Sequence, residues 1–206
     1  MKSLDHENII KLHEVHNTTK QVILNTEFCG ETNLQNYLNH YNNIIRLSEV
    51  RDILVSLAKA LNYLHSKGVS HRDIKLENIL MNPQGVIKLI DFGFAVMDAD
   101  GDVLLDNYCG TPAYMSPEIV ERKLYDGHKA DMWALGILTY KIVCGKFPFK
   151  ESPDHDLYSA IVNQEVRVSS GVPLKLRSLI LRLLEKDPAK RPTAGEILSD
   201  EWILDV

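Results

Sequence analysis

The segment between residues 48 and 68 constrains the fold more than any other part of this sequence. Its apolar side chains recur at intervals of three and four residues, at Val50, Ile53, Leu54, Leu57, Ala58, Leu61 and Leu64. That spacing places them on one face of a helix. Ser48 is a suitable N-cap residue, and Gly68 is a natural residue to follow the last turn. The sequence therefore predicts a long amphipathic helix with one face buried against a core.

Shorter elements surround this helix. Two strands are expected before it, over residues 8–15 and 21–28. After it, the runs NILMN and VIKLI predict a hairpin that turns at Pro83-Gln84-Gly85. Helical patterns follow in residues 129–144, 154–163, 175–184 and 193–199. A small sheet followed by a helix-rich body indicates an α+β fold.

The composition narrows the class of protein. With 206 residues and 45% hydrophobic content, the chain can bury a substantial core. Its net charge of −5 argues against nucleic-acid binding. Three widely spaced cysteines, an odd number, favour a reducing compartment. There is no apolar run of membrane-spanning length, and the first residues are too polar for a signal peptide. We therefore expect a cytoplasmic protein, with the nucleus as the alternative, and no membrane partner.

Residues 71–78, called here the polar loop, carry the groups that phosphoryl transfer requires. That reaction needs a carboxylate to orient the attacking hydroxyl, a cation for the travelling phosphate and oxygen ligands for Mg²⁺. The loop supplies Asp73, Lys75 and Asn78 for these three tasks. A second metal carboxylate, Asp91, follows the predicted hairpin, where the chain would return beside the loop.

Five motifs occur in an order that resembles the eukaryotic protein kinases: HRDIKLEN, DFG, GTPAYMSPE, DMWALG and the pair Arg191-Pro192. The resemblance covers essentially the whole chain. It implies a protein-kinase-like fold with a mostly helical C-terminal lobe. Lys75 favours serine/threonine specificity, and Phe94 accompanies a serine preference in that family. The runs CGTPAYMSPEI and GKFPF most resemble the calcium/calmodulin-dependent and AMP-activated group.

The resemblance implies ATP and Mg²⁺ as cofactors and assigns the reacting groups. Asp73 would be the catalytic carboxylate and Lys75 the contact to the γ-phosphate. Thr111 would hydrogen-bond both of them and help to form the substrate-binding loop. Asn78 and Asp91 would bind Mg²⁺.

The same resemblance assigns a nucleotide pocket. The carbonyl of Glu27 and the N–H of Cys29 would meet the adenine edge, with Leu80 as the apolar floor. Thr26 stands at the gatekeeper position. Asn33 occupies the place of an acidic ribose contact, and its amide can still hydrogen-bond there.

Other motif residues are assigned to the scaffold. His71 and Phe92 would pack in the regulatory spine. Asp131 would hold the backbone of the polar loop. Glu118 and Arg191 would form a buried ion pair.

The sequence also departs from the family pattern, first at its N-terminal end. It contains no G-x-G-x-x-G loop and no V-A-I-K-type strand. We therefore expect a partial kinase domain, residues 1–206, lacking most of the N-terminal lobe. Residues 1–28 would be the remnant of that lobe with the hinge approach, and residues 29–206 the C-terminal lobe. The remnant would leave an exposed sheet edge that invites a covering partner chain.

Two further departures concern regulation and substrate choice. Asn107 stands where the usual phosphorylated threonine lies, and Val96 replaces a basic group that would bind its phosphate. Arg72 remains, and Asp106 is expected to replace the phosphate in part. An acidic tip is expected at residues 98–102. Lys141 replaces an acidic residue that would read a substrate arginine together with Glu77.

The sequence thus predicts a serine/threonine protein kinase that transfers the ATP γ-phosphoryl group to protein hydroxyls. We expect the 206-residue chain to be a poor catalyst by itself. The alternative is a kinase-derived binding module without activity. It would hold partners through residues 154–163 or through the activation segment, which runs from the DFG motif to the end of GTPAYMSPE (residues 91–118).

Overall fold

The predicted amphipathic helix forms the centre of the molecule as α2 (Leu47–Ser66). Its apolar face lies in the main hydrophobic core. The helix ends as predicted, because Gly68 adopts a left-handed φ of 68° and donates its N–H to the last turn. The predicted start is wrong. Arg46 is the N-cap residue in place of Ser48. The backbone N–H of Arg46 donates a hydrogen bond to the Glu49 carboxylate at 3.0 Å.

A second long helix, α4 (Gly127–Cys144), packs against α2 and is buried on nearly all sides. It begins two residues earlier than predicted, because the Asp126 side chain accepts hydrogen bonds from the first N–H groups of the helix. It ends at Gly145, whose φ of 68° stops the helix. The two long helices together define the core of the body.

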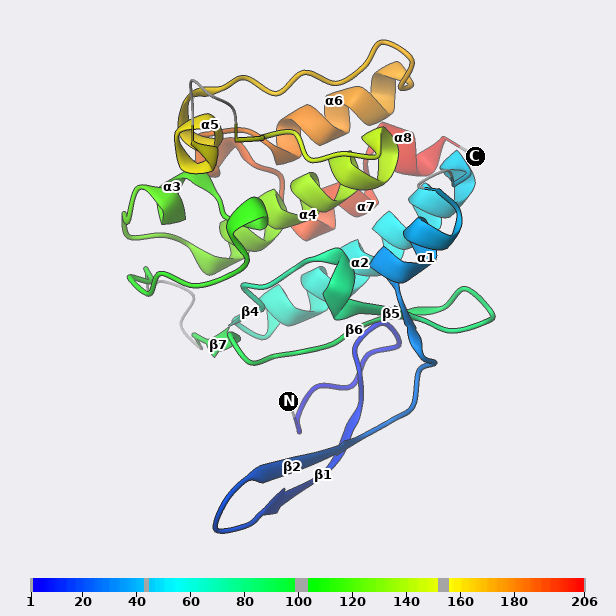
Figure 1. Cartoon of the computed structure of the whole chain (residues 1–206), viewed down its shortest axis with the longest axis vertical. Helices are drawn as coiled ribbons and strands as arrows, with labels where there is room; N and C mark the ends of the chain where they lie inside the picture. The colour runs from blue at the N-terminus through cyan, green and yellow to red at the C-terminus, as the bar shows by residue number, and fades with distance from the viewer. Residues whose placement is uncertain (1, 43–44, 99–103, 152–155, 206) are drawn as a thin grey trace.

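The computed structural model describes residues 2–42, 45–98, 104–151 and 156–205. Its remaining helices are α1 (Leu34–His40), α3 (Pro117–Val120), α5 (Leu157–Asn163), α6 (Leu174–Leu183), α7 (Ala194–Leu198) and α8 (Glu201–Leu204), with 3₁₀ turns η1 (Leu76–Asn78), η2 (Pro112–Tyr114) and η3 (Pro188–Lys190). The first two residues of the helix expected at 154–163, and most of the acidic tip at 98–102, lie outside the described residues. In Figure 1, α4 and α6 lie above α2.

The predicted hairpin at residues 79–89 is confirmed. Strands β5 (Ile79–Met81) and β6 (Ile87–Leu89) pair antiparallel, and Gly85 supplies the left-handed residue of the turn. The short strand β3 (Thr32–Asn33) joins β5 on its other side. A separate pair, β4 (Val69–Ser70) and β7 (Val96–Met97), flanks the polar loop. These short strands around the helical body agree with the α+β prediction.

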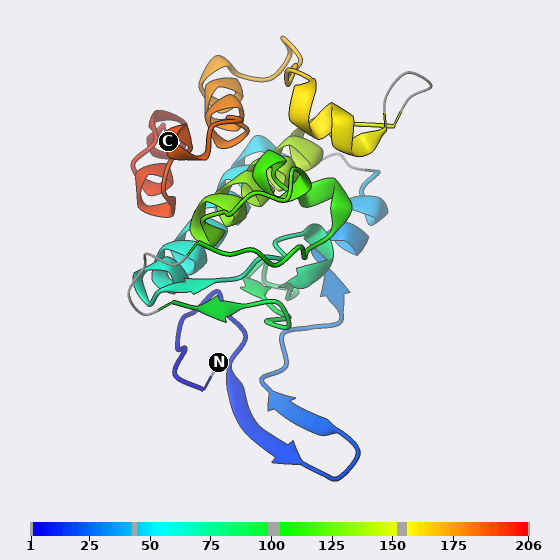
Figure 2. The ribbon, with the colours of Figure 1, turned by 90° about the vertical axis from the view of Figure 1, so that its left-hand side faces the viewer.

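The first residues are divided between the body and a projecting hairpin. Residues 8–10 belong to the body, because Leu89 donates its N–H to the Asn8 carbonyl and accepts a hydrogen bond from the Ile10 N–H. The strand predicted at 8–15 therefore begins later, as β1 (Leu12–Asn17), and pairs with β2 (Val22–Thr26). This hairpin extends away from the body in Figures 1 and 2. All five residues of β2 are exposed.

A buried ion pair joins the end of the activation segment to the C-terminal part of the body, as predicted. Arg191 is 1% exposed, and its two terminal nitrogens lie 2.6 and 2.7 Å from the two carboxylate oxygens of Glu118. Its guanidinium also donates to three backbone carbonyls. Because every donor is satisfied, the buried charge is compensated.

None of the helices in the described part of the chain combines the length and the apolar character needed to cross a bilayer.

The buried ion pair between Glu118 and Arg191 can be tested by mutation. Glu118→Gln should lower the free energy of unfolding by about 3–5 kcal/mol, because it leaves the Arg191 charge buried without a counter-charge. Urea unfolding followed by circular dichroism measures this loss. The matched control is Glu7→Gln, which breaks the exposed pair of Glu7 and Lys59 and should cost less than about 0.5 kcal/mol. Equal losses in the two variants would contradict the prediction.

Candidate active site

The polar loop is held by one buried carboxylate, that of Asp131 in α4. Its oxygens accept hydrogen bonds from the N–H groups of His71 at 2.9 Å and Arg72 at 2.7 Å, and from the ring of His65 at 3.0 Å. Burial acts to raise the pKa of Asp131, but these donors and the nearby histidines lower it overall. The bonds hold Arg72 at a φ of 66°, which is unfavourable for a residue with a side chain. Asp131 thus holds the backbone of the polar loop, as the sequence predicted.

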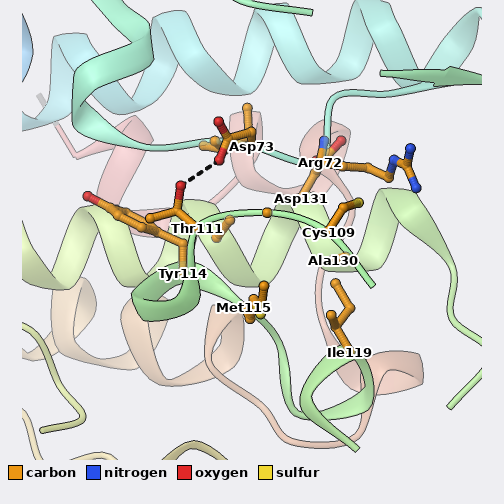
Figure 3. A pocket seen from close by; sticks show the side chains of 12 residues that line it. Arg72, Asp73, Cys109, Thr111, Tyr114, Met115, Ile119, Ala130 and Asp131 are labelled. Carbon is orange, nitrogen blue, oxygen red and sulfur yellow. Dashed lines mark hydrogen bonds between the residues drawn. The ribbon is translucent and has the colours of Figure 1, made fainter. Parts of the chain in front are cut away.

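Asp73 lies at the centre of a cluster of predicted residues. One carboxylate oxygen accepts a hydrogen bond from the Thr111 hydroxyl at 2.8 Å, as Figure 3 shows. The other accepts from Lys75 Nζ at 2.6 Å and from the Asn78 amide at 2.9 Å. Burial acts to raise the pKa of Asp73, but the donors from Lys75 and Thr111 outweigh it and lower the pKa. Asp73 is therefore ionised at neutral pH and can accept a hydrogen bond from a hydroxyl.

His71 connects the polar loop to the segment that carries Asp91. Its ring packs edge-on against Phe92 with centroids 4.8 Å apart, and one ring nitrogen lies 3.0 Å from the Ile90 carbonyl oxygen. His71 is fully buried, and burial lowers its pKa, so the neutral ring is a packing group. Asp91 itself is exposed and has a φ of 60°. The N–H of Ile90 also bonds to the Asn78 carbonyl, which brings Asp91 beside the loop.

A cavity of ≈ 470 Å³ collects most of the predicted nucleotide contacts. It is lined by Thr26, Glu27, Cys29, Leu80 and Asp91, among others. The carbonyl of Glu27 and the N–H of Cys29 form no backbone hydrogen bond with another described residue, so both are available to a ligand. Asn33 does not line this cavity. Its side-chain oxygen instead accepts a hydrogen bond from the Asn36 N–H and caps α1.

The predicted metal ligands fit a hard cation that also binds phosphate. The Asn78 amide nitrogen donates its hydrogen bonds to Asp73, so the side-chain oxygen of Asn78 is the atom that could bind a metal ion. Asp91 supplies a carboxylate, one oxygen of which accepts a hydrogen bond from the Gly93 N–H. Within the described ranges, no group of three or more His, Cys, Asp and Glu side chains could hold a metal ion. Two oxygen ligands suit Mg²⁺ bound together with phosphate and water.

The arginine of the polar loop has a partner that the sequence analysis did not identify. Arg72 donates to the Phe94 carbonyl at 2.7 Å and to the Tyr125 hydroxyl at 3.1 Å. That hydroxyl donates in turn to the carbonyl of Asn107 at 3.0 Å. No ion pair between Arg72 and Asp106 occurs among the described residues, so the expected replacement of the phosphate by Asp106 is not seen. Neutral groups connect Arg72 to the activation segment instead.

The chain belongs to the protein kinase domain family, whose model matches residues 1–203. It is 37% identical over 202 residues to CBL-interacting protein kinase 8 of Oryza sativa subsp. japonica, covering 98% of this chain and 45% of that protein. It is 36% identical over 203 residues to probable serine/threonine-protein kinase MARK-A of Dictyostelium discoideum, covering 98% of this chain and 19% of that protein. It is 35% identical over 217 residues to serine/threonine-protein kinase 33 of Bos taurus, covering 98% of this chain and 44% of that protein.

These matches confirm the predicted family, the serine/threonine type and the likeness to the calcium/calmodulin-dependent and AMP-activated group. The chain spans less than half the length of each of the three relatives.

Tyr125→Phe tests the connection between Arg72 and the activation segment. Removing the hydroxyl should cost about 1 kcal/mol, because Arg72 and the Asn107 carbonyl each lose a partner. The Leu105 amide, which bonds to the Tyr125 carbonyl, should then exchange hydrogen about fivefold faster. Hydrogen–deuterium exchange measures the change, with Tyr41→Phe on the exposed end of α1 as the control. Unchanged exchange at Leu105 would contradict it.

Proposed function

We propose that this chain forms the phosphoryl-transfer part of a serine/threonine protein kinase, with ATP as phosphoryl donor, Mg²⁺ as cofactor and protein hydroxyls as acceptors. The observation that carries the proposal is the cluster in which Asp73 is bonded to Lys75, Thr111 and Asn78. The cavity that contains Asp91 supports it from the nucleotide side.

In the proposed reaction, the substrate hydroxyl donates a hydrogen bond to Asp73, which orients its oxygen toward the γ-phosphorus. The new bond forms between that oxygen and phosphorus while the bond to the bridging oxygen of ADP breaks, and the hydroxyl proton passes to Asp73. Lys75 stabilises negative charge on the phosphoryl oxygens, and Thr111 holds Asp73 in place. Mg²⁺, held by Asn78 and Asp91, would neutralise phosphate charge.

A second candidate is a kinase-derived binding module without catalytic activity. The exposed β2 strand, with Val22 63% exposed and Ile23 and Leu24 also exposed, favours an associated chain that covers it. For either candidate we propose a cytoplasmic location, with the nucleus as the alternative.

The purified chain, incubated with ATP, Mg²⁺ and a serine peptide, should transfer phosphate above an Asp73→Asn blank. We expect a rate well below the usual ~1–10³ s⁻¹, because the sequence contains neither a glycine-rich loop nor a V-A-I-K-type lysine to hold the triphosphate in line. Each ~1.4 kcal/mol of lost positioning reduces the rate tenfold. Transfer equal to that of Asp73→Asn would support the binding module instead.

Lys141 should weaken the preference for substrates that contain arginine. Its Nζ donates a 2.5 Å hydrogen bond to the side-chain oxygen of Gln35. Burial lowers the pKa of Lys141, while Glu77 opposes that effect. Lys141→Glu should raise the selectivity for an arginine peptide over its alanine counterpart about fivefold, equivalent to ~1 kcal/mol of charge interaction. A peptide array compares the two proteins, with Lys67→Glu as the control. A strong arginine requirement in the unmodified protein would contradict the prediction.

A further inference from the structure

A polar groove of ≈ 800 Å³ lies at the end of the body that carries α5. One wall is the turn after α4, with Lys146, Phe147 and Lys150. The other wall is the segment that follows α5, with Glu165 and Arg167. The hydroxyl of Tyr140 donates to the Arg167 carbonyl at 3.0 Å and joins the two walls.

The groove is positively charged, in contrast to the whole chain. Lys146, Lys150 and Arg167 are all exposed, and none of them forms an ion pair with a described residue. Glu165 is the one carboxylate among the described lining residues, although Glu151 follows Lys150 directly. The chain carries a net charge of −5, so this concentration of unpaired cations is not a property of its general surface.

Contacts between side chains connect the groove to the acceptor site. Tyr114, which lines the same small cavity as Asp73 and Thr111, packs edge-on against Phe147 with centroids 5.4 Å apart. Phe147 lines the groove. The Nζ of Lys141 lies 4.2 Å from the centre of the Phe147 ring and adds a fourth cation at this end. A polypeptide with its hydroxyl at Asp73 can therefore continue into the groove.

We propose that this groove binds an acidic segment of the protein substrate. The identity of the occupant as a substrate rests on the proposed function, whereas binding of an acidic peptide does not require phosphoryl transfer. Three unpaired cations on facing walls match carboxylates on an extended chain, in which successive side chains point to opposite sides. A nucleic acid is a weaker match, because Lys141 already lies over the Phe147 face on which a base would stack.

The experiment measures peptide binding to the 206-residue chain by fluorescence anisotropy at low and at physiological salt. The probes are labelled peptides that share one acceptor serine and carry a block of four glutamates or four glutamines, before or after it. The test variant is Lys146→Glu/Arg167→Glu, with one change on each wall. The control is Lys20→Glu/Lys67→Glu, which alters net charge equally at exposed lysines elsewhere. A single-stranded oligonucleotide of similar charge serves as competitor.

We expect at least one glutamate peptide to bind about tenfold more tightly than its glutamine counterpart, equivalent to ~1.4 kcal/mol. Lys146→Glu/Arg167→Glu should remove that preference, the control should retain it, and physiological salt should reduce it. Equal binding of the two peptide types, equal losses in both variants, or equal displacement by the oligonucleotide would overturn the proposal. Groove-dependent binding without phosphoryl transfer would leave the groove assignment standing and contradict the proposed catalysis.

Discussion

The carboxylate of Asp131 is the interaction on which the rest of the site depends. It comes from the most deeply buried helix, α4, and holds two successive N–H groups of the polar loop. Those bonds stabilise the left-handed conformation of Arg72, and the same turn directs Asp73 toward Thr111 and His71 toward Phe92. The loop is thus positioned by a rigid element of the core, which is how a short irregular segment can hold charged groups in a defined arrangement.

Three contacts fix the activation segment to the body, and each has a different physical character. Thr111 bonds to the carboxylate of Asp73, and Tyr125 bonds to Arg72 through a neutral hydroxyl. At the end of the segment, Glu118 pairs with Arg191 where water is excluded. A phosphate bound to Arg72 would have to displace the hydrogen bonds that Phe94 and Tyr125 now provide. Among the described residues, neutral hydrogen bonds supply this connection.

The residues that line the cavity proposed to bind the nucleotide are not all held equally well by the rest of the structure. Leu80 and Asp91 come from the packed body. Thr26, in contrast, is the last residue of the exposed strand β2, and Glu27 and Cys29 follow it. A two-stranded hairpin is marginally stable without further packing, so the side of the cavity proposed to contact adenine has the weaker scaffold. The groups proposed for catalysis and the proposed metal ligands Asn78 and Asp91 are held by the body itself. The cluster around Asp73 is therefore held independently of the β1–β2 hairpin.

Local patterns in the sequence determined the helices, turns and motifs that depend on the spacing of nearby residues. The apolar period of α2, the Gly68 and Gly85 turns and the motif residues around Asp73 could be read directly, and the structure brings Asp73, Lys75, Thr111 and Asn78 together. Tertiary structure decided the rest. Asn33 caps α1, and residues 8–10 pair with the body. Tyr125 is the partner of Arg72. Lys146, Lys150 and Arg167, which are separate in the sequence, line one groove. These outcomes depend on contacts between residues distant in the chain, for which neither periodicity nor local propensity carries a signal.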